Sequence, residues 1–170
     1  TAKEARFLAG LKAALQAGFR ALQRGRSSLD AVEAAVKVLE DCPLFNAGKG
    51  AVLTIDGHVE LDAAIMDGAS CDAGAVAAVR TIKNPVSAAR AVMQQAEHVL
   101  FAGKGAERFA RHAGLQMVAN EYFMTPDRQK QWQKLRDDGV NRERKYGTVG
   151  AVALDARGNL AAATSTGGMM

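Results

Sequence analysis

The sequence has 170 residues, of which 48% are hydrophobic and 24% are charged, and its formal net charge is +4. This composition is typical of one soluble globular domain and excludes an intrinsically disordered chain. Many of the basic residues fall between Arg128 and Lys145 without a recognition motif, so we expect no nucleic-acid partner. No window has the length and apolarity of a membrane span, so we expect no membrane partner either.

Two helices are expected at the start of the chain. From residue 2 to about residue 23, apolar side chains recur at helical spacing and predict one buried stripe, made of Phe7, Leu8, Leu11, Leu15, Phe19 and Leu22. A second helix should begin after Ser27, which fits a capping box with Asp30. It should end near Glu40, because Pro43 prevents it from continuing far.

The middle of the chain has the pattern of β structure. A glycine-punctuated loop at 46–50 leads into two expected strands, 51–54 and 59–66, joined by a hairpin turn at 56–57. A further strand is expected at 72–82, the stretch DAGAVAAVRTI. Its alanines and glycine predict that a neighbouring element packs very close to it.

Helices are expected again in the second half. They span residues 84–97, 104–114 and 125–135. After Gly139 the chain is polar and resembles a linker, and a β-hairpin follows from Gly147 with its turn at 155–158. This order of elements predicts an α/β (α+β) layered domain with helices on both sides of the sheet.

The usual catalytic motifs are absent from the sequence. It has no G-x-G-x-x-G, P-loop, G-x-S-x-G or H-E-x-x-H pattern. The histidines, His58, His98 and His112, form no cluster, so they indicate neither a metal site nor a Ser–His pair. Asp62 and Asp67 should lie on opposite faces of a strand, which makes them poor candidates for paired carboxylates. The two cysteines have no disulfide or metal spacing, which suits a reducing compartment.

Thr148 lies between two glycines at the head of an apolar run, in the stretch KYGTVGAVALD. A threonine hydroxyl is a weak nucleophile and needs a base. If the bond between Gly147 and Thr148 is cut, the new α-amino group, with a pKa of about 7.7–8, lies within reach of its own hydroxyl. The cut can be autocatalytic, through attack of the hydroxyl on the Gly147 carbonyl, and glycine permits the strained backbone that this attack requires. From spacing alone, Thr148 can also be an ordinary β-favouring residue that starts a strand.

Three blocks of the sequence resemble the plant-type L-asparaginase / isoaspartyl peptidase family, whose members are amino-terminal-nucleophile (Ntn) hydrolases. The blocks are residues 29–79, which contain LEDCPLFNAGKG, residues 84–110, and residues 147–169, GTVGAVALDARGNLAAATSTGGM. They occur in the family's order, and together the resemblance covers nearly the whole chain except about 116–146.

The resemblance implies a self-processing threonine amidohydrolase. It would cleave isoaspartyl (β-aspartyl) dipeptides and L-asparagine through an acyl-enzyme on Thr148, after the bond from Gly147 to Thr148 has been cut. The implied fold is an αββα four-layer sandwich of the Ntn-hydrolase type, incomplete in this chain. Residues 1–147 would be the α-subunit part, with about 139–147 removed or trimmed, and 148–170 would start the β-subunit of the same domain. Two such units would associate as (αβ)2.

The resemblance also implies roles for further residues. Thr166 would hydrogen-bond the nucleophile, and Asn46 would orient the processing site. A structural sodium ion is possible, held by the main-chain carbonyls of Leu39, Glu40, Cys42, Phe45, Ala47 and Lys49. No other cofactor is expected.

The sequence departs from the family at both ends. Family members begin with a strand that bears a His-Gly-Gly-Ala-Gly-like segment, and the residues that clamp the substrate and form the oxyanion hole follow the point where this sequence stops. Met169-Met170 also departs from the usual Gly-Gly-Met-Thr continuation. We therefore expect residues 1–170 to be a fragment, inactive if the chain truly ends there.

Two alternatives remain open at the level of sequence. One is a glycosylasparaginase-type hydrolase, which the absence of a secretory signal and of a disulfide framework disfavours. The other is a catalytically silent fragment that only assembles with a partner subunit. The same absences predict a cytoplasmic protein.

Overall fold

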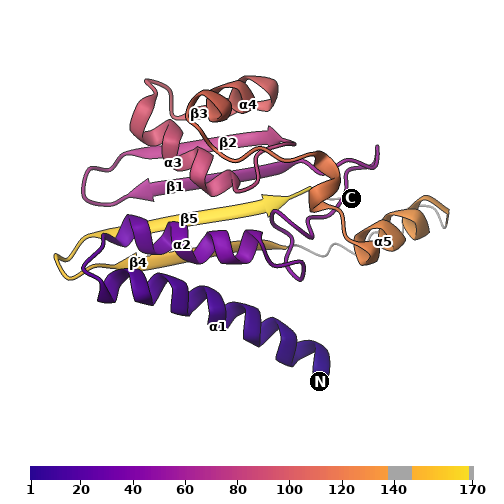
Figure 1. The fold of residues 1–170 in the computed structure, drawn as a ribbon, viewed down its shortest axis with the longest axis horizontal. Coiled ribbons are helices and arrows are strands. Elements are labelled where there is room, and N and C mark those ends of the chain that lie inside the picture. The colour runs from indigo at the N-terminus through magenta and orange to yellow at the C-terminus, as the bar shows by residue number, and fades with distance from the viewer. Residues whose placement is uncertain (138–146, 169–170) are drawn as a thin grey trace.

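A computed structural model describes residues 1–137 and 147–168, and its centre is one five-stranded sheet (Figure 1). The strands are β1 (Leu61–Asp67), β2 (Ala73–Val79), β3 (Leu100–Ala102), β4 (Thr148–Leu154) and β5 (Leu160–Gly167). Their order across the sheet is β3-β2-β1-β5-β4, and only β2 and β3 run parallel. Because β5 pairs with β1, the last strands of the chain lie beside strands that come about a hundred residues earlier.

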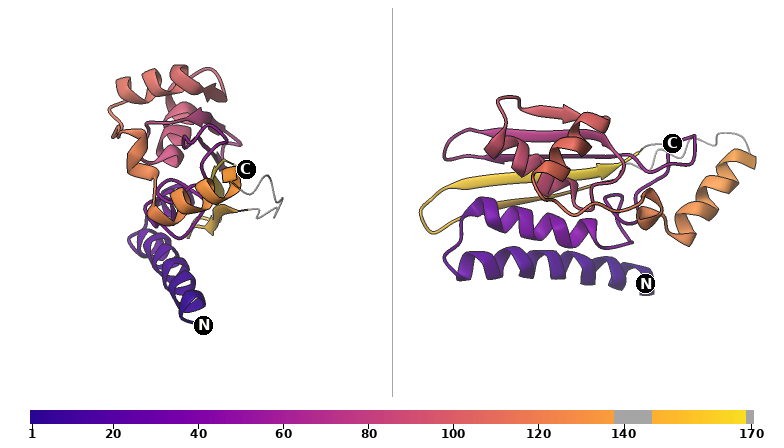
Figure 2. Two further views of the ribbon diagram at one scale, coloured as in Figure 1. Left: turned by 90° about the vertical axis from the view of Figure 1, so that its right-hand side faces the viewer. Right: turned by 45° about the horizontal axis from the view of Figure 1, so that its top comes forward.

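Most of the helices lie on one face of this sheet, whereas the helix at Pro126–Asp137 projects beyond its end (Figure 2). They are α1 (Ala2–Gln23), α2 (Ser28–Glu40), α3 (Pro85–Gln95), α4 (Gly103–His112), the short 3-10 helix η1 (Asn120–Phe123) and α5 (Pro126–Asp137). The helices α2 and α3 pack directly on the strands, and α1 packs on α2. The combination of helices with a mixed sheet confirms the predicted α/β class.

The prediction that helices cover both faces of the sheet is wrong for the described residues. In β1 and β5, buried and exposed side chains alternate, so only one face contacts the helices. The opposite face, here called the open face, leaves large apolar side chains exposed, including Met66, Val152, Leu154 and Leu160. The order of elements alone could not show this, because it does not say on which side of a sheet each helix packs.

The predicted buried stripe of α1 is also wrong. Leu8 is 63% exposed and Leu15 is 72% exposed, whereas the helix buries Ala14, Gly18 and Ala21. A Cβ atom added to Gly18 would lie 3.0 Å from the carbonyl oxygen of Ala31 in α2. The two helices therefore approach each other through small residues, and the larger apolar residues of α1 lie outside their contact.

The β predictions are right for the strand at 72–82 and only partly right for the hairpin at 51–66. Residues 51–54 form no strand, and a single bridge joins Leu53 to Val59 across the expected turn. The short strand β3 was not predicted. The expected close packing on β2 is confirmed, because a Cβ atom at Gly74 would lie 2.1 Å from the carbonyl oxygen of Ala89 in α3.

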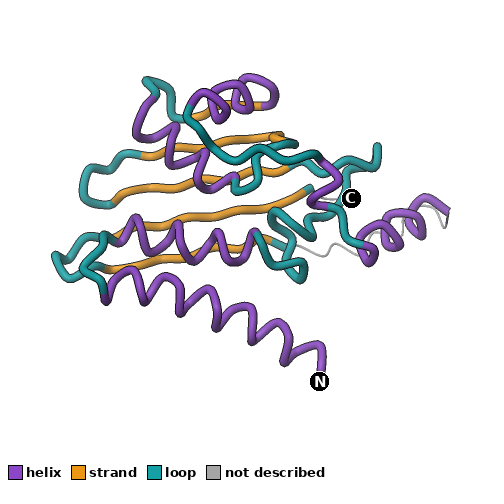
Figure 3. Tube along the Cα trace, viewed as in Figure 1, coloured by secondary structure: helices purple, strands orange, loops and turns teal. Residues whose placement is uncertain are grey.

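A long loop joins α2 to β1 and lies at the end of the sheet where β5 ends and β4 begins (Figure 3). It brings residues 41–60 to that end. The segment expected to be trimmed, about 139–147, lies outside the described residues except for Gly147. No helix within 1–137 or 147–168 has the length and apolarity needed to cross a membrane.

Candidate active site

Strands β4 and β5 bring Thr148 and Thr166 together. Thr148 is the first residue of β4, and it is paired directly with Thr166 near the end of β5. Directly opposed residues of antiparallel strands present their side chains on the same face. The Thr148 hydroxyl accordingly donates to Thr166 Oγ1 over 3.2 Å, and Thr166 Oγ1 donates to the carbonyl oxygen of Gly147 over 2.9 Å.

Asn46 makes a second hydrogen bond to the same carbonyl. Its Nδ2 lies 2.9 Å from the oxygen of Gly147 and 3.3 Å from that of Gly168. Its Oδ1 accepts from the N–H of Val52 at 2.8 Å, and its own carbonyl accepts from the N–H of Gly167 at 3.0 Å. Since both ends of the buried side chain are held, the amide nitrogen faces Gly147.

Two glycines allow this close contact. A Cβ atom at Gly147 would lie 2.9 Å from Cβ of Asn46, and one at Gly167 would lie 2.5 Å from Asn46 Oδ1. Neither distance leaves room for a side chain unless the loop moves. Glycine at these positions therefore lets the loop and the two strands meet around one carbonyl.

The arrangement suits attack on the carbonyl of Gly147. Two donors, Asn46 Nδ2 and the Thr166 hydroxyl, polarise its oxygen and would stabilise negative charge on it. The Thr148 hydroxyl is the candidate nucleophile, and its proton already points to Thr166 Oγ1. The four residues predicted around the cleavage bond thus lie together in the structure.

The chain is similar to known proteins over nearly its whole length. The family model described as asparaginase matches residues 1–170. This chain belongs to the asparaginase family. It is 50% identical to the isoaspartyl peptidase of Escherichia coli, 48% identical to the isoaspartyl peptidase/L-asparaginase of Danio rerio and 49% identical to the plant-type L-asparaginase of Pyrococcus abyssi.

These matches include nearly all of the chain but only part of each relative. They cover 98%, 95% and 95% of this chain, and 55%, 53% and 57% of the respective relative. The chain thus spans just over half the length of these asparaginase-family proteins. The comparisons confirm the resemblance on which the sequence analysis relied, and the family has the Ntn-hydrolase fold.

In this asparaginase-family chain, the predicted sodium residues lie at the end of α2 and in the loop that follows. Gly48 and Gly50 have φ values of +48° and +96°, and they turn the loop back on α2, where the N–H of Lys49 donates to the carbonyl of Glu40 at 2.7 Å. No hydrogen bond from a described residue reaches the carbonyls of Phe45, Ala47 or Lys49, although Ala47 is fully buried. Buried carbonyls need a partner, and oxygen donors suit a hard cation. The carbonyls of Leu39, Glu40 and Cys42 already accept hydrogen bonds from the N–H groups of Cys42, Lys49 and Phe45, so the sodium site stays a prediction.

The side chain of Glu40 is a feature that the sequence did not reveal. It is fully buried, Oε1 accepts from the N–H of Val86 at the start of α3, and Oε2 has no hydrogen-bond partner among the described residues. Burial raises the pKa of this carboxyl to about 7. Nothing in a helical pattern distinguishes such a residue from an exposed glutamate at a helix end.

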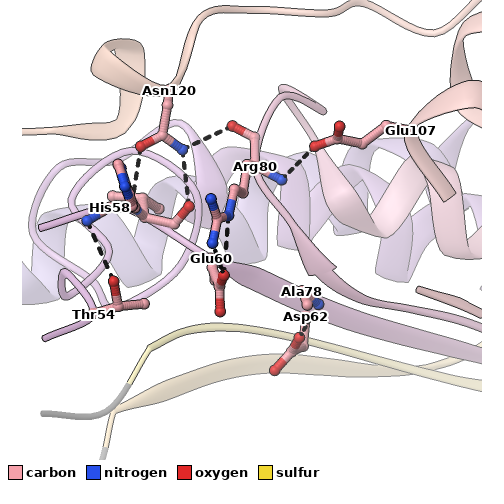
Figure 4. Close-up of polar contacts among 9 residues, drawn as sticks. Thr54, His58, Glu60, Asp62, Ala78, Arg80, Glu107 and Asn120 are labelled. Carbon is pink, nitrogen blue, oxygen red and sulfur yellow. Dashed lines mark hydrogen bonds and ion pairs between the residues drawn. The ribbon is translucent and has the colours of Figure 1, made fainter. Parts of the chain in front are cut away.

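A polar network at the same end of the sheet was also missed (Figure 4). Asn120 of η1 donates to the carbonyls of Val59 and Arg80, which connects the start of β1 to the end of β2. The Arg80 guanidinium contacts Glu60, and the Arg80 N–H donates to Glu107 at 2.7 Å. Within the described residues, no three His, Cys, Asp or Glu side chains are grouped so that they could hold a metal.

Proposed function

We propose that the protein is a self-processing threonine amidohydrolase that cleaves isoaspartyl dipeptides and L-asparagine. One observation carries the proposal. The carbonyl of Gly147 accepts hydrogen bonds from Asn46 and Thr166, while the Thr148 hydroxyl is bonded to Thr166. The names of the relatives, isoaspartyl peptidase and L-asparaginase, support the choice of substrates.

Self-cleavage would begin with Thr148. Its Oγ attacks the carbonyl carbon of Gly147 while its proton passes to Thr166 Oγ1 and the proton of Thr166 passes to the carbonyl oxygen, which Asn46 holds. The peptide C–N bond then breaks and the Thr148 nitrogen takes the proton, which leaves Gly147 attached to Thr148 as an ester. Water hydrolyses the ester, releasing the carboxylate of Gly147 and the free amino terminus of Thr148.

The new α-amino group is the base for the second reaction. In its neutral form it accepts the proton of the Thr148 hydroxyl, which attacks the side-chain amide or isopeptide carbonyl of the substrate. Ammonia leaves from L-asparagine, and an amino acid leaves from an isoaspartyl dipeptide. Water then hydrolyses the acyl-enzyme and returns Thr148 to its starting form.

A structural sodium ion belongs to the proposal. When bound, it would neutralise the partial negative charge of the carbonyls that hold it, which are those of Leu39, Glu40, Cys42, Phe45, Ala47 and Lys49. Its place in the fold would fix the loop that carries Asn46, and it would take no part in bond breaking.

The assembly and location are also proposals. A cleaved unit would pair with a second copy as (αβ)2. The free thiols of Cys42 and Cys71 support a reducing compartment such as the cytoplasm.

The test is a denaturing gel and an ammonia assay on the full-length protein. The wild type should split into two pieces, the second starting at Thr148, and should release ammonia from L-asparagine. Thr148→Ala should abolish both events. Thr164→Ala is the matched control, because Thr164 lies on β5 two residues before Thr166 and its hydroxyl makes no hydrogen bond within the described residues. A wild type that stays intact and releases nothing would contradict the proposal.

A further inference from the structure

Asp62 lies in the same row of side chains as the two threonines. On β1 it is paired with Thr166 of β5, and Thr166 is paired with Thr148 of β4. Directly opposed residues share a face of the sheet, so all three side chains lie on the open face. A hollow of about 320 Å³ on this face is lined by both Asp62 and Thr166. From sequence, Asp62 was set aside only as a partner of Asp67 in a pair of carboxylates, and spacing along one strand does not show what faces Asp62 across the sheet.

The backbone around Asp62 is irregular in a way that fixes its carboxylate. The pairing of β1 with β2 shifts register between Leu61 and Ala63, which places a bulge in β2, where Ala77 and Ala78 together oppose Asp62. The N–H of Ala78 donates to Asp62 Oδ1 at 2.7 Å (Figure 4), and Ala78 has a φ of +52°, in the left-handed region that disfavours alanine. Bulges beside active sites re-aim side chains, and strain of this kind collects at functional sites.

Only one oxygen of the Asp62 carboxylate accepts a hydrogen bond from the described residues. Oδ1 accepts from Ala78, whereas no hydrogen bond from a described residue reaches Oδ2. Its neighbour across the strand pair, Thr166, donates its single proton to the carbonyl of Gly147. Cleavage would turn that carbonyl into a carboxylate at the end of a separate chain, and the Thr166 hydroxyl would then need another acceptor. The carbonyl of Gly167 lies 3.4 Å away, which is long for a hydroxyl.

We propose that Asp62 is a positioning residue of the mature site, and this inference rests on the proposed function. Once Gly147 has left, Asp62 Oδ2 accepts the hydrogen bond of Thr166. A hydroxyl that donates to a carboxylate makes a strong, charge-assisted bond and becomes a better acceptor itself. Its lone pairs then face Thr148 and hold the nucleophile in the orientation needed for attack.

The two reactions should depend on Asp62 differently. In self-cleavage, the hydroxyl of Thr166 has the carbonyl of Gly147 as its acceptor, so the carboxylate is not required. In substrate hydrolysis that acceptor has gone. Asp62→Asn keeps an oxygen for the N–H of Ala78 but cannot offer a second acceptor to Thr166. A residue that only supported the fold would affect both reactions together.

The experiment measures both reactions in the full-length protein carrying Asp62→Asn. Self-cleavage should proceed at the wild-type rate, followed on a denaturing gel. In the cleaved enzyme, kcat for an isoaspartyl dipeptide should fall about tenfold with little change in KM, the usual effect of one lost hydrogen bond to a charged group. Glu60→Gln is the control, because Glu60 precedes Asp62 by two residues near the start of β1 and pairs with Arg80 outside the threonine row.

A second variant distinguishes loss of the hydrogen bond from Ala78 to Asp62 from loss of the proposed hydrogen bond from Thr166 to Asp62. In Asp62→Ala combined with Ala78→Gly, glycine adopts the positive φ without support, so the fold should survive while kcat stays low. Recovery of kcat in this double variant would overturn the inference, as would a wild-type kcat in Asp62→Asn or an equal loss of both reactions. A wild type that neither cleaves itself nor hydrolyses the dipeptide would overturn the proposed function and this inference with it.

Discussion

At the scale of single residues, the site depends on how closely the loop approaches β4 and β5. Asn46 reaches the carbonyl of Gly147 because no side chain stands between them. The neighbouring contacts at Gly167 and Val52 prevent the amide from moving aside. The geometry around the Gly147 carbonyl should therefore be sensitive to one added methyl group.

Gly147→Ala should slow self-cleavage. The new Cβ would lie 2.9 Å from Cβ of Asn46, so the amide must withdraw from the scissile carbonyl. Loss of one donor to a developing oxyanion typically costs a factor of roughly a hundred in rate. The rate can be measured from the loss of the intact band over time on a denaturing gel of the full-length protein.

Gly105→Ala is the control for an added methyl group. Gly105 lies in α4, and a Cβ there would meet nothing within 4 Å. This variant should cleave normally and melt at a slightly higher temperature, since alanine favours a helix over glycine by about 1 kcal/mol. Wild-type cleavage in Gly147→Ala would show that the Asn46 contact does not hold the carbonyl for attack.

The residues of the site could be predicted from the sequence to different degrees. The chemistry of Thr148 could be argued from its glycine neighbour and the base that cleavage creates. Asn46 and Thr166 came only from the family resemblance, because their meeting depends on strand pairing and a loop between distant segments. Asp62 was dismissed for the same reason: face alternation along a strand is visible in sequence, but the register with its neighbours is not.

At the scale of elements, periodicity predicted helices well where large apolar residues carry the contact. In α2, Leu29, Val32, Val36 and Leu39 face the core as expected. In α1 the same reasoning chose the wrong face, since Gly18 and two alanines make the contact with α2. Hydrophobic spacing identifies a helix, but small residues can decide which side of it is packed.

The junction of α2 with α3 should make stability depend on pH. Glu40 has a pKa of about 7 in the folded protein, above its ordinary value of 4.5, because burial disfavours the charged carboxylate. A raised pKa means that the folded state holds the proton more tightly than the unfolded state. Stability is therefore greatest below the unfolded value and falls as the pH rises through about 7, by on the order of 3 kcal/mol.

Glu40→Gln should remove much of this dependence. The amide keeps an oxygen for the N–H of Val86 and carries no charge at any pH. When the pH is raised from about 5 to about 8, the melting temperature should fall further in the wild type than in the variant. Glu33→Gln is the control, since Glu33 lies on the same helix but is paired with Arg90. An equal drop in the wild type and in Glu40→Gln would show that another group controls the pH response.

At the scale of the whole molecule, the sheet is covered on one side only within the described residues. The open face carries the threonine row at one end and exposed apolar side chains along its length, among them Val152 and Leu160. Exposed apolar surface of this extent usually marks a contact with another part of the protein. Since the family has the Ntn-hydrolase fold, we expect a second layer to cover this face.

Val152→Asp in the full-length protein tests that coverage. Val152 is 82% exposed here, and at a truly exposed position the change should cost less than about 0.5 kcal/mol. If a second layer covers the strand, the aspartate is buried without a partner, and the free energy of unfolding should fall by about 2–4 kcal/mol. Ile55→Asp is the matched control, because Ile55 is 76% exposed and lies in the turn before β1, not on a strand of the sheet. Melting curves of the two variants give both changes in stability. A larger loss of stability for Val152→Asp than for Ile55→Asp supports a covered sheet. Equal small losses would show that this face, including the threonine row, is open to solvent.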